Sequence, residues 1–215
     1  ADTVANANAG YMLVVNAAGN EGTDKWHFIG APADADSVLS VGGIDPATGY
    51  HTSFSSYGPT ADKRMKPNVS AYGHVVAAAP AGLTSTQGTS FASPLVAGFA
   101  ACAWQSNRSL TNMQLFREIE KSGSLYPYFD YAHGYGVPQA GYFVEAKPAA
   151  TVPTFKVAES GDSLTIVIDK PLVAAGKVNP GFGKSFAEPA GPVPVANSEY
   201  LYYNIMDAGG VLRSY

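Results

Sequence analysis

The sequence predicts an α/β fold with a mostly parallel sheet, and three stretches carry that prediction. Residues 11–15 are a short, unbroken run of apolar β-forming residues, which is typical of a parallel strand buried on both faces, and residues 38–41, mostly apolar, are a second buried strand candidate. Residues 91–104 are apolar over a length sufficient for a buried helix of about four turns. Strands combined with a core helix of this kind indicate a layered α/β domain.

The composition of the 215-residue chain is that of a globular protein with a large core. Hydrophobic residues make up 46% and charged residues only 14%, below the roughly 25% of an average soluble domain. The net charge of −4 argues against a nucleic-acid partner, because phosphate binding needs a basic face. No apolar run approaches the ~18 residues that span a bilayer. The lone Cys102 excludes an internal disulfide, and we expect it to be buried.

Residues 2–9 are expected to be the end of a helix, closed by Gly10. After the first strand, residues 17–22 form a loop at the strand's carboxyl end, which is where open α/β sheets bind ligands. The apolar residues 75–78 predict a third buried strand, ended by Pro80.

A second helix is predicted from Thr111 to about Lys121. Residues 111–114 have the Thr-x-x-Gln form of a capping box, in which side chains and backbone N–H groups pair reciprocally. The apolar face of this helix is expected to comprise Leu115, Phe116 and Ile119.

The Ala- and Pro-rich residues 147–153 are typical of a linker. They separate a first domain, residues 1–146, from a β-rich extension, residues 154–215, with too few predicted strands to be a complete domain. Within the extension, the alternating residues 155–168 predict a hairpin and residues 200–203 a further strand.

The segment from Gly88 to Gly98 is the most informative for chemistry. Ser90 stands in the first turn of the predicted helix, where its backbone N–H has no intrahelical acceptor and the positive end of the helix dipole is near. The small neighbours Gly88 and Ala92 leave room for a substrate backbone. A nucleophile and an N-cap serine on a core helix both fit these features, so the segment's physics leaves both open.

Two segments resemble motifs of the subtilisin-like serine proteases. Residues 88–98, Gly-Thr-Ser-Phe-Ala-Ser-Pro-Leu-Val-Ala-Gly, resemble the family's nucleophile motif at nine of eleven positions. Residues 14–22, Val-Val-Asn-Ala-Ala-Gly-Asn-Glu-Gly, are similar to its oxyanion-hole loop and precede the first motif in the family's order. Shorter matches extend the resemblance to roughly residues 1–145; they lie at residues 37–42, 54–58 and 134–136.

The resemblance implies a fold and a set of roles. Residues 1–146 would be the C-terminal part of a three-layer subtilisin-like catalytic domain. Ser90 would be the nucleophile, and Asn20 would donate its side-chain amide to the oxyanion, with Thr89 in support. A wall of the pocket for the residue before the cut, with one residue near its mouth, would consist of Ala17, Ala18, Gly19 and Glu21. Peptides or proteins would be the substrates.

The family requires no cofactor and no catalytic metal. Some members bind a weak structural calcium ion through backbone carbonyls, in the segment that matches residues 33–38 here. The family also implies secretion or a location in the cell envelope.

The catalytic Asp and His of the family precede its Ser, yet no histidine precedes Asn20 in this sequence. The four histidines lie outside the family's His-Gly-Thr context and are expected to be structural; they are His27, His51, His74 and His133. Without a base to take its proton, a serine is a poor nucleophile. We therefore expect the chain alone to be inactive and the missing residues to come from an N-terminal catalytic half.

Two other interpretations are open. A subtilisin-like scaffold could bind a peptide or protein partner without cutting it. An α/β-hydrolase would use Asp130 and His133 after Ser90, but its nucleophile follows a hydrophobic strand, and residues 83–87 are mostly polar.

Overall fold

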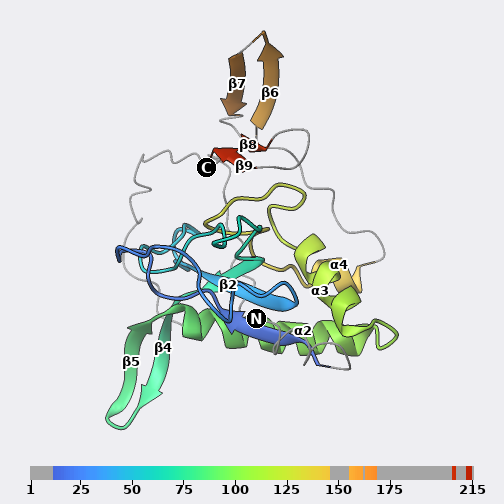
Figure 1. Ribbon diagram of the computed structural model, residues 1–215. Helices are drawn as coiled ribbons and strands as arrows, with labels where there is room; N and C mark the ends of the chain where they lie inside the picture. Colours follow the sequence, from blue (N-terminus) through green and yellow to red (C-terminus); the bar gives the residue numbers. More distant parts are fainter. Residues whose placement is uncertain (1–11, 146–154, 162, 169–204, 207–211, 215) are drawn as a thin grey trace. The chain divides into compact units, whose positions relative to one another are not determined.

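A computed structural model of the chain describes residues 12–145, 155–161, 163–168, 205–206 and 212–214 (Figure 1). The helix predicted at residues 2–9, the linker at residues 147–153 and the strand predicted at residues 200–203 lie outside these ranges. The chain divides into two compact units, Ala1–Ala149 with Ser198–Tyr215, and Ala150–Asn197.

The first unit contains a parallel sheet of three strands in the order β1-β2-β3. The strands are β1 (Val14–Ala17), β2 (Val38–Ile44) and β3 (Val69–Tyr72). All seven residues of the central strand β2 are buried, as is expected of a strand with neighbours on both sides. β1 is only half-buried, because it is an edge strand within the described part of the chain.

The third strand of this sheet is not the one that the sequence predicted. Residues 75–78 belong to β4 (His74–Ala79), which pairs antiparallel with β5 (Gly82–Gln87) in a separate two-stranded sheet. The place beside β2 is taken by β3, whose sequence Val-Ser-Ala-Tyr is too short and too polar to stand out. The predicted strand at residues 75–78 therefore exists, but the prediction that it is buried was wrong, because hydrophobicity marks a strand but does not identify its neighbours.

Helix α2 (Thr89–Ser106) packs along the sheet with one face, formed by Thr89, Ala92, Val96, Ala100 and Ala103. The prediction of a wholly buried helix was wrong. On the opposite face Leu95 is 48% exposed and Cys102 is exposed as well, since no described element covers that face. The expected burial of Cys102 was therefore also wrong.

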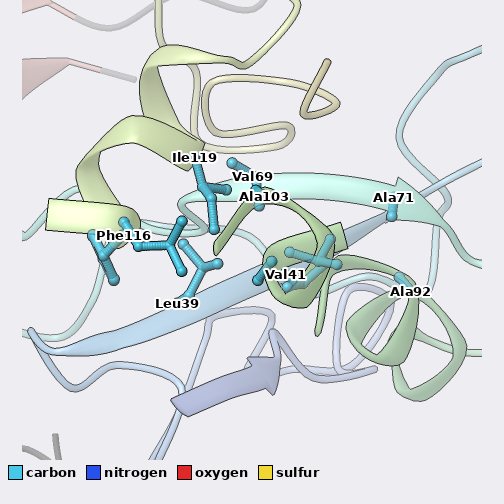
Figure 2. Close-up of a cluster of buried hydrophobic side chains, with 11 residues drawn as sticks. Leu39, Val41, Val69, Ala71, Ala92, Ala103, Phe116 and Ile119 are labelled. Atoms are coloured by element: carbon cyan, nitrogen blue, oxygen red, sulfur yellow. The ribbon is translucent and has the colours of Figure 1, made fainter. Parts of the chain in front are cut away.

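The main core lies between the sheet and the helices (Figure 2). Helix α3 (Asn112–Lys121) contributes the three apolar residues that the sequence predicted, Leu115, Phe116 and Ile119. Its predicted capping box is confirmed, because Thr111 Oγ1 accepts from Gln114 N at 3.2 Å and Thr111 N donates to Gln114 Oε1 at 2.8 Å. The short helix α4 (Gly141–Val144) follows.

The remaining described elements are two antiparallel hairpins. Strands β6 (Phe155–Ser160) and β7 (Ser163–Ile168) pair as predicted, and Gly161 between them takes a positive φ of 57°. Strands β8 (Ile205–Met206) and β9 (Leu212–Ser214) form the second pair.

Candidate active site

The site lies where the carboxyl end of β1 meets the start of α2. Asn20 belongs to the loop that follows β1, and Ser90 is the second residue of α2, which begins at Thr89. Both Asn20 and Ser90 are exposed. The N-cap is Gly88 and not a serine; its φ of 145° is a conformation that residues with a Cβ rarely adopt. Gly88 therefore allows the change of chain direction between β5 and α2.

Thr89 holds the Asn20 side chain in one orientation. The backbone N–H and the hydroxyl of Thr89 both donate to Asn20 Oδ1, at 2.9 and 3.0 Å. The same hydroxyl lies 3.3 Å from Gly19 N and 3.2 Å from Gly19 O. Because a backbone N–H can only donate, the atom that faces it must be the amide oxygen. The two N–H donors of Asn20 Nδ2 are therefore available to another acceptor.

Two donors are thus available near the nucleophile candidate. A Cβ placed on Gly88 would lie 3.6 Å from Asn20 Nδ2, so this amide nitrogen is beside the start of α2. The N–H of Ser90 belongs to the first turn and has no acceptor within the helix. Both groups lie at the positive end of an 18-residue helix. This arrangement can bind a developing oxyanion.

The residues expected to line the substrate pocket differ in accessibility. Ala17 ends β1 and is half-buried, whereas the Ala18 side chain is packed against Ile29 and Ala33 in a small second core. Gly19 is partly exposed, with a φ of 113°. Ala17, Gly19 and the half-buried Glu21 therefore retain accessible surface, whereas Ala18 does not.

The Glu21 side chain is held by a hydrogen bond from Ser56. Its carboxylate accepts a 2.6 Å hydrogen bond from the Ser56 hydroxyl, which in turn accepts from Glu21 N at 3.1 Å. A Cβ on Gly19 would come within 2.3 Å of the Glu21 carboxylate. Sequence reasoning did not assign a role to Ser56, although it lies within the Phe-Ser-Ser-Tyr-Gly match at residues 54–58.

The described histidines take part in contacts within the protein. His27 Nδ1 lies 2.6 Å from Gly22 O, and the His74 ring contacts Phe54. His133 pairs with Asp130 at 3.1 Å through Nδ1 and accepts from His51 N at 2.9 Å through Nε2. The Asp130–His133 pair is thus engaged with His51, and β5, the strand before Ser90, is a polar member of an exposed hairpin. Neither feature suits an α/β-hydrolase elbow.

His51 is held neutral by its surroundings. Its ring lies against Tyr57, with centroids 4.1 Å apart, and edge-on to His133 at 5.9 Å. Burial, reinforced by the nearby His133, lowers the pKa of His51 to about 3.

The segment expected to hold calcium does not fit that ion. Arg64 Nη1 donates to Asp34 O at 2.6 Å and to the Asp36 carboxylate at 2.8 Å. The buried Lys66 Nζ donates to Val38 O at 2.5 Å. Two cationic side chains therefore already occupy oxygens that a calcium ion would need.

Within the described residues, no group of three or more His, Cys, Asp or Glu side chains is placed to hold a metal ion. Among the helices of these same residues, none has the length and apolar character needed to cross a bilayer.

The fold and the site define an α/β protein with a helix-borne serine faced by an asparagine amide, and comparison with known proteins identifies the family. The model of the subtilase family, Peptidase_S8, matches residues 1–136. The chain therefore belongs to the subtilase family of serine peptidases, and the subtilisin-like α/β fold predicted from the sequence is confirmed.

The matches between this chain and its relatives cover only part of each relative's length. Subtilisin DY of Bacillus licheniformis is 37% identical over 122 residues, which cover 56% of this chain and 43% of that protein. Subtilisin-like protease SBT6.1 of Arabidopsis thaliana is 40% identical over 98 residues, or 42% of this chain and 9% of that protein. The chain thus spans less than half the length of these relatives.

Solved structures likewise superpose on this chain over about half of their own length. Sphericase superposes with a TM-score of 0.52 at 27% identity, covering 60% of this chain and 48% of that one. The self-cleaved protease domain of PatA superposes with a TM-score of 0.51 at 27% identity, covering 66% and 51%.

Proposed function

We propose that this chain is the nucleophile-bearing part of a serine endopeptidase, with Ser90 as nucleophile and Asn20 as oxyanion donor. The observation that carries the proposal is the pair of hydrogen bonds from Thr89 to Asn20 Oδ1, which leaves Asn20 Nδ2 beside the start of α2. Membership of the subtilase family supports it.

The proposed reaction is acyl transfer in two steps. Ser90 Oγ attacks the carbonyl carbon of the scissile peptide bond, and its proton passes to a histidine base. The negative charge that develops on the carbonyl oxygen is bound by Asn20 Nδ2 and the Ser90 N–H. The intermediate then expels the amine, which takes the proton, and leaves an acyl ester on Ser90. Water hydrolyses this ester.

The histidine base and its aspartate would come from an N-terminal catalytic half that is not part of this sequence. Two features of the described residues support such a partner: β1 is an edge strand, and α2 exposes an apolar face that includes Leu95. Alone, the chain would have almost no activity, because an ordinary serine is scarcely ionised at neutral pH.

The substrate would be a peptide or protein whose side chain before the cut enters a pocket bordered by Ala17 and Gly19. The Ala18 backbone would complete this wall, with Glu21 near the mouth. Small residues there favour a medium to large apolar side chain. We further propose that residues 1–146 act as the catalytic part, joined by residues 147–153 to the extension, and that the protein is secreted or lies in the cell envelope.

Reaction with a fluorophosphonate probe tests the proposal. We expect Ser90 to be labelled in a longer protein that contains the upstream half, and to be almost unlabelled in the 215-residue chain alone. Ser90→Ala is the control, since it removes the only atom that is expected to react. Absence of labelling in both forms would favour a non-catalytic scaffold that binds a peptide.

A further inference from the structure

Strands β4 and β5 form a hairpin that stands apart from the rest of the first unit. The six residue pairs from His74↔Gln87 to Ala79↔Gly82 bond only to each other within the described sheets, and no other described helix or strand packs closely on the pair. In Figure 1 the hairpin extends away from the sheet and from α2. Isolated two-stranded hairpins are marginally stable in water, so a bound partner would stabilise this one.

The free edge of β5 lacks the usual protection against strand pairing. Proteins guard exposed edges with lysines, other charges, prolines or bulges. The hairpin sequence from His74 to Gln87 contains no Lys, Arg, Asp or Glu, and its one proline is in the turn. The pairing of β4 with β5 is regular throughout. An open, uncharged edge of this kind is suited to receive another extended chain.

One face of the hairpin offers apolar contacts to such a chain. The register places Val76 opposite Ser85, and Ala78 opposite Leu83, so these four side chains share a face. Val76 is 64% exposed and Leu83 is 78% exposed. These are large apolar side chains on an element that contributes nothing to either described core.

The hairpin is continuous with the proposed active site. β5 ends at Gln87, three residues before Ser90, and Gly88 N donates to Gly73 O at 2.9 Å, which ties both strands together at their base. The adjacent Gly88 lies beside Asn20 Nδ2. At about 3.3 Å per residue, Leu83 is ~13 Å along the strand from Gln87. An extended peptide covers that distance in about four residues.

We propose that the free edge of β5 binds the substrate segment that follows the scissile bond, as a third antiparallel strand. This proposal rests on the proposed function. Because β5 runs toward Ser90 and the leaving segment runs away from it, the two are antiparallel. Apolar substrate side chains about four to six residues after the cut contact Leu83. The favoured substrate is therefore an extended, uncharged chain with apolar residues at alternate positions in that segment.

Cleavage of matched peptides by the longer protein tests the pairing. Three peptides share the residues up to the second position after the cut. The first continues with alternating Val and Thr, the second has the same continuation N-methylated at alternate amides, and the third ends at the second position. We expect N-methylation and truncation each to lower kcat/KM about tenfold, as the loss of one or two ladder hydrogen bonds implies. Equal values for the three peptides would overturn the proposal and leave the proposed function intact.

A variant pair identifies the surface. Leu83→Ser should lower kcat/KM for the full-length peptide but not for the truncated one. The control is Val144→Ser, because Val144 is 75% exposed on α4; it should change neither value. An equal effect of Leu83→Ser on both peptides would contradict pairing along β5.

Binding is measured separately, so that an inactive protein still gives a result. A fluorescein-labelled Val/Thr peptide is titrated into the 215-residue Ser90→Ala chain, with the N-methylated peptide as control. Tighter binding of the unmethylated peptide, abolished by Leu83→Ser, supports the proposal even if no peptide is cleaved. Equal binding of both peptides would overturn the proposal. So would sedimentation of the chain as a dimer that the Leu83→Ser substitution dissociates.

Discussion

At the residue scale, Thr89 fixes the orientation of the Asn20 amide through both its backbone N–H and its hydroxyl. Thr89 is fully buried and bonds to both Gly19 and Asn20, so it links the loop after β1 to the start of α2. In the proposed mechanism Thr89 is a positioning residue: it would not touch the reacting atoms, but its donors determine which end of the Asn20 amide is available.

Replacing Thr89 by valine in a longer protein that contains the proposed N-terminal half should lower kcat and leave KM nearly unchanged, because the oxyanion forms after substrate binding. Loss of an oxyanion donor costs about 10²–10³ in kcat, a magnitude that was measured in a subtilisin; the Thr89→Val effect should be smaller, since the backbone N–H remains. Thr89→Ser should restore most of the activity. A valine variant with raised KM and normal kcat would contradict the positioning role.

The buried His51 should make stability depend on pH. Its folded-state pKa is about 3 against 6.5 in the unfolded chain. Between these values the unfolded chain binds a proton that the folded chain does not, so stability is full above about pH 6.5 and falls as pH decreases toward 3. The slope from this group approaches 1.4 kcal/mol per pH unit. The charged and titratable groups facing it are His133, Asp130 and His27.

Urea unfolding of the 215-residue chain at pH 7, 6, 5 and 4 measures this dependence. His51→Phe keeps an aromatic ring against Tyr57 and should flatten the slope below pH 6.5. The same slope in the wild type and the variant would show that His51 is not the group responsible.

At the scale of single elements, helix α3 depends on its cap. The capping box pairs two backbone N–H groups at the start of the helix that would otherwise lack partners. Thr111→Ala should therefore lower the free energy of unfolding by about 1 kcal/mol. Thr111→Ser, which retains the acceptor, should lower it by less. Chemical denaturation of both variants measures the difference, and equal losses would show that the hydroxyl does not act as a cap.

The loop from Ala33 to Val38 is held by cations of the protein itself. Arg64 bonds to Asp34 O and to Asp36, and it also pairs with Asp62 at 2.8 Å. Millimolar calcium should therefore leave the melting temperature of the wild-type chain unchanged. In Arg64→Ala the loop loses its cation, so its melting temperature should be lower and should rise again with calcium. A calcium-dependent rise in the wild type would contradict the role assigned to Arg64.

At the scale of the whole molecule, helix α2 leaves one apolar face exposed within the described part of the chain. One face of α2 is buried against the sheet while the other is apolar and exposed. The N-terminal half proposed above would cover that face and supply the base.

Mixing the chain with the separately produced N-terminal half should restore labelling of Ser90 by a fluorophosphonate. Leu95→Lys should lower this labelling at least about tenfold, because a charge would be buried in the new interface. Val144→Lys, on an exposed part of α4, is the matched control and should have no effect. Equal labelling with both variants would place the contact elsewhere.

Local sequence determined the features whose causes are local. The capping box and apolar face of α3 follow from residues three or four apart. The buried strand β2 follows from its mostly apolar residues 38–41. The family resemblance rests on contiguous motifs, and it led to Asn20 and Ser90 without any structure; their catalytic roles stay predictions.

Tertiary structure decided which element lies beside which. Residues 75–78 and residues 69–72 could each have extended the sheet, and only packing assigned that place to β3. Cys102 and Leu95 are as apolar as core residues, yet nothing described covers them. Arg64 and Lys66 donate hydrogen bonds to the loop of residues 33–38, although they lie 28 or more residues along the chain from the oxygens that accept. The physical reason is common to these cases: a residue's own chemistry sets what it can contact, whereas burial and pairing depend on distant parts of the chain.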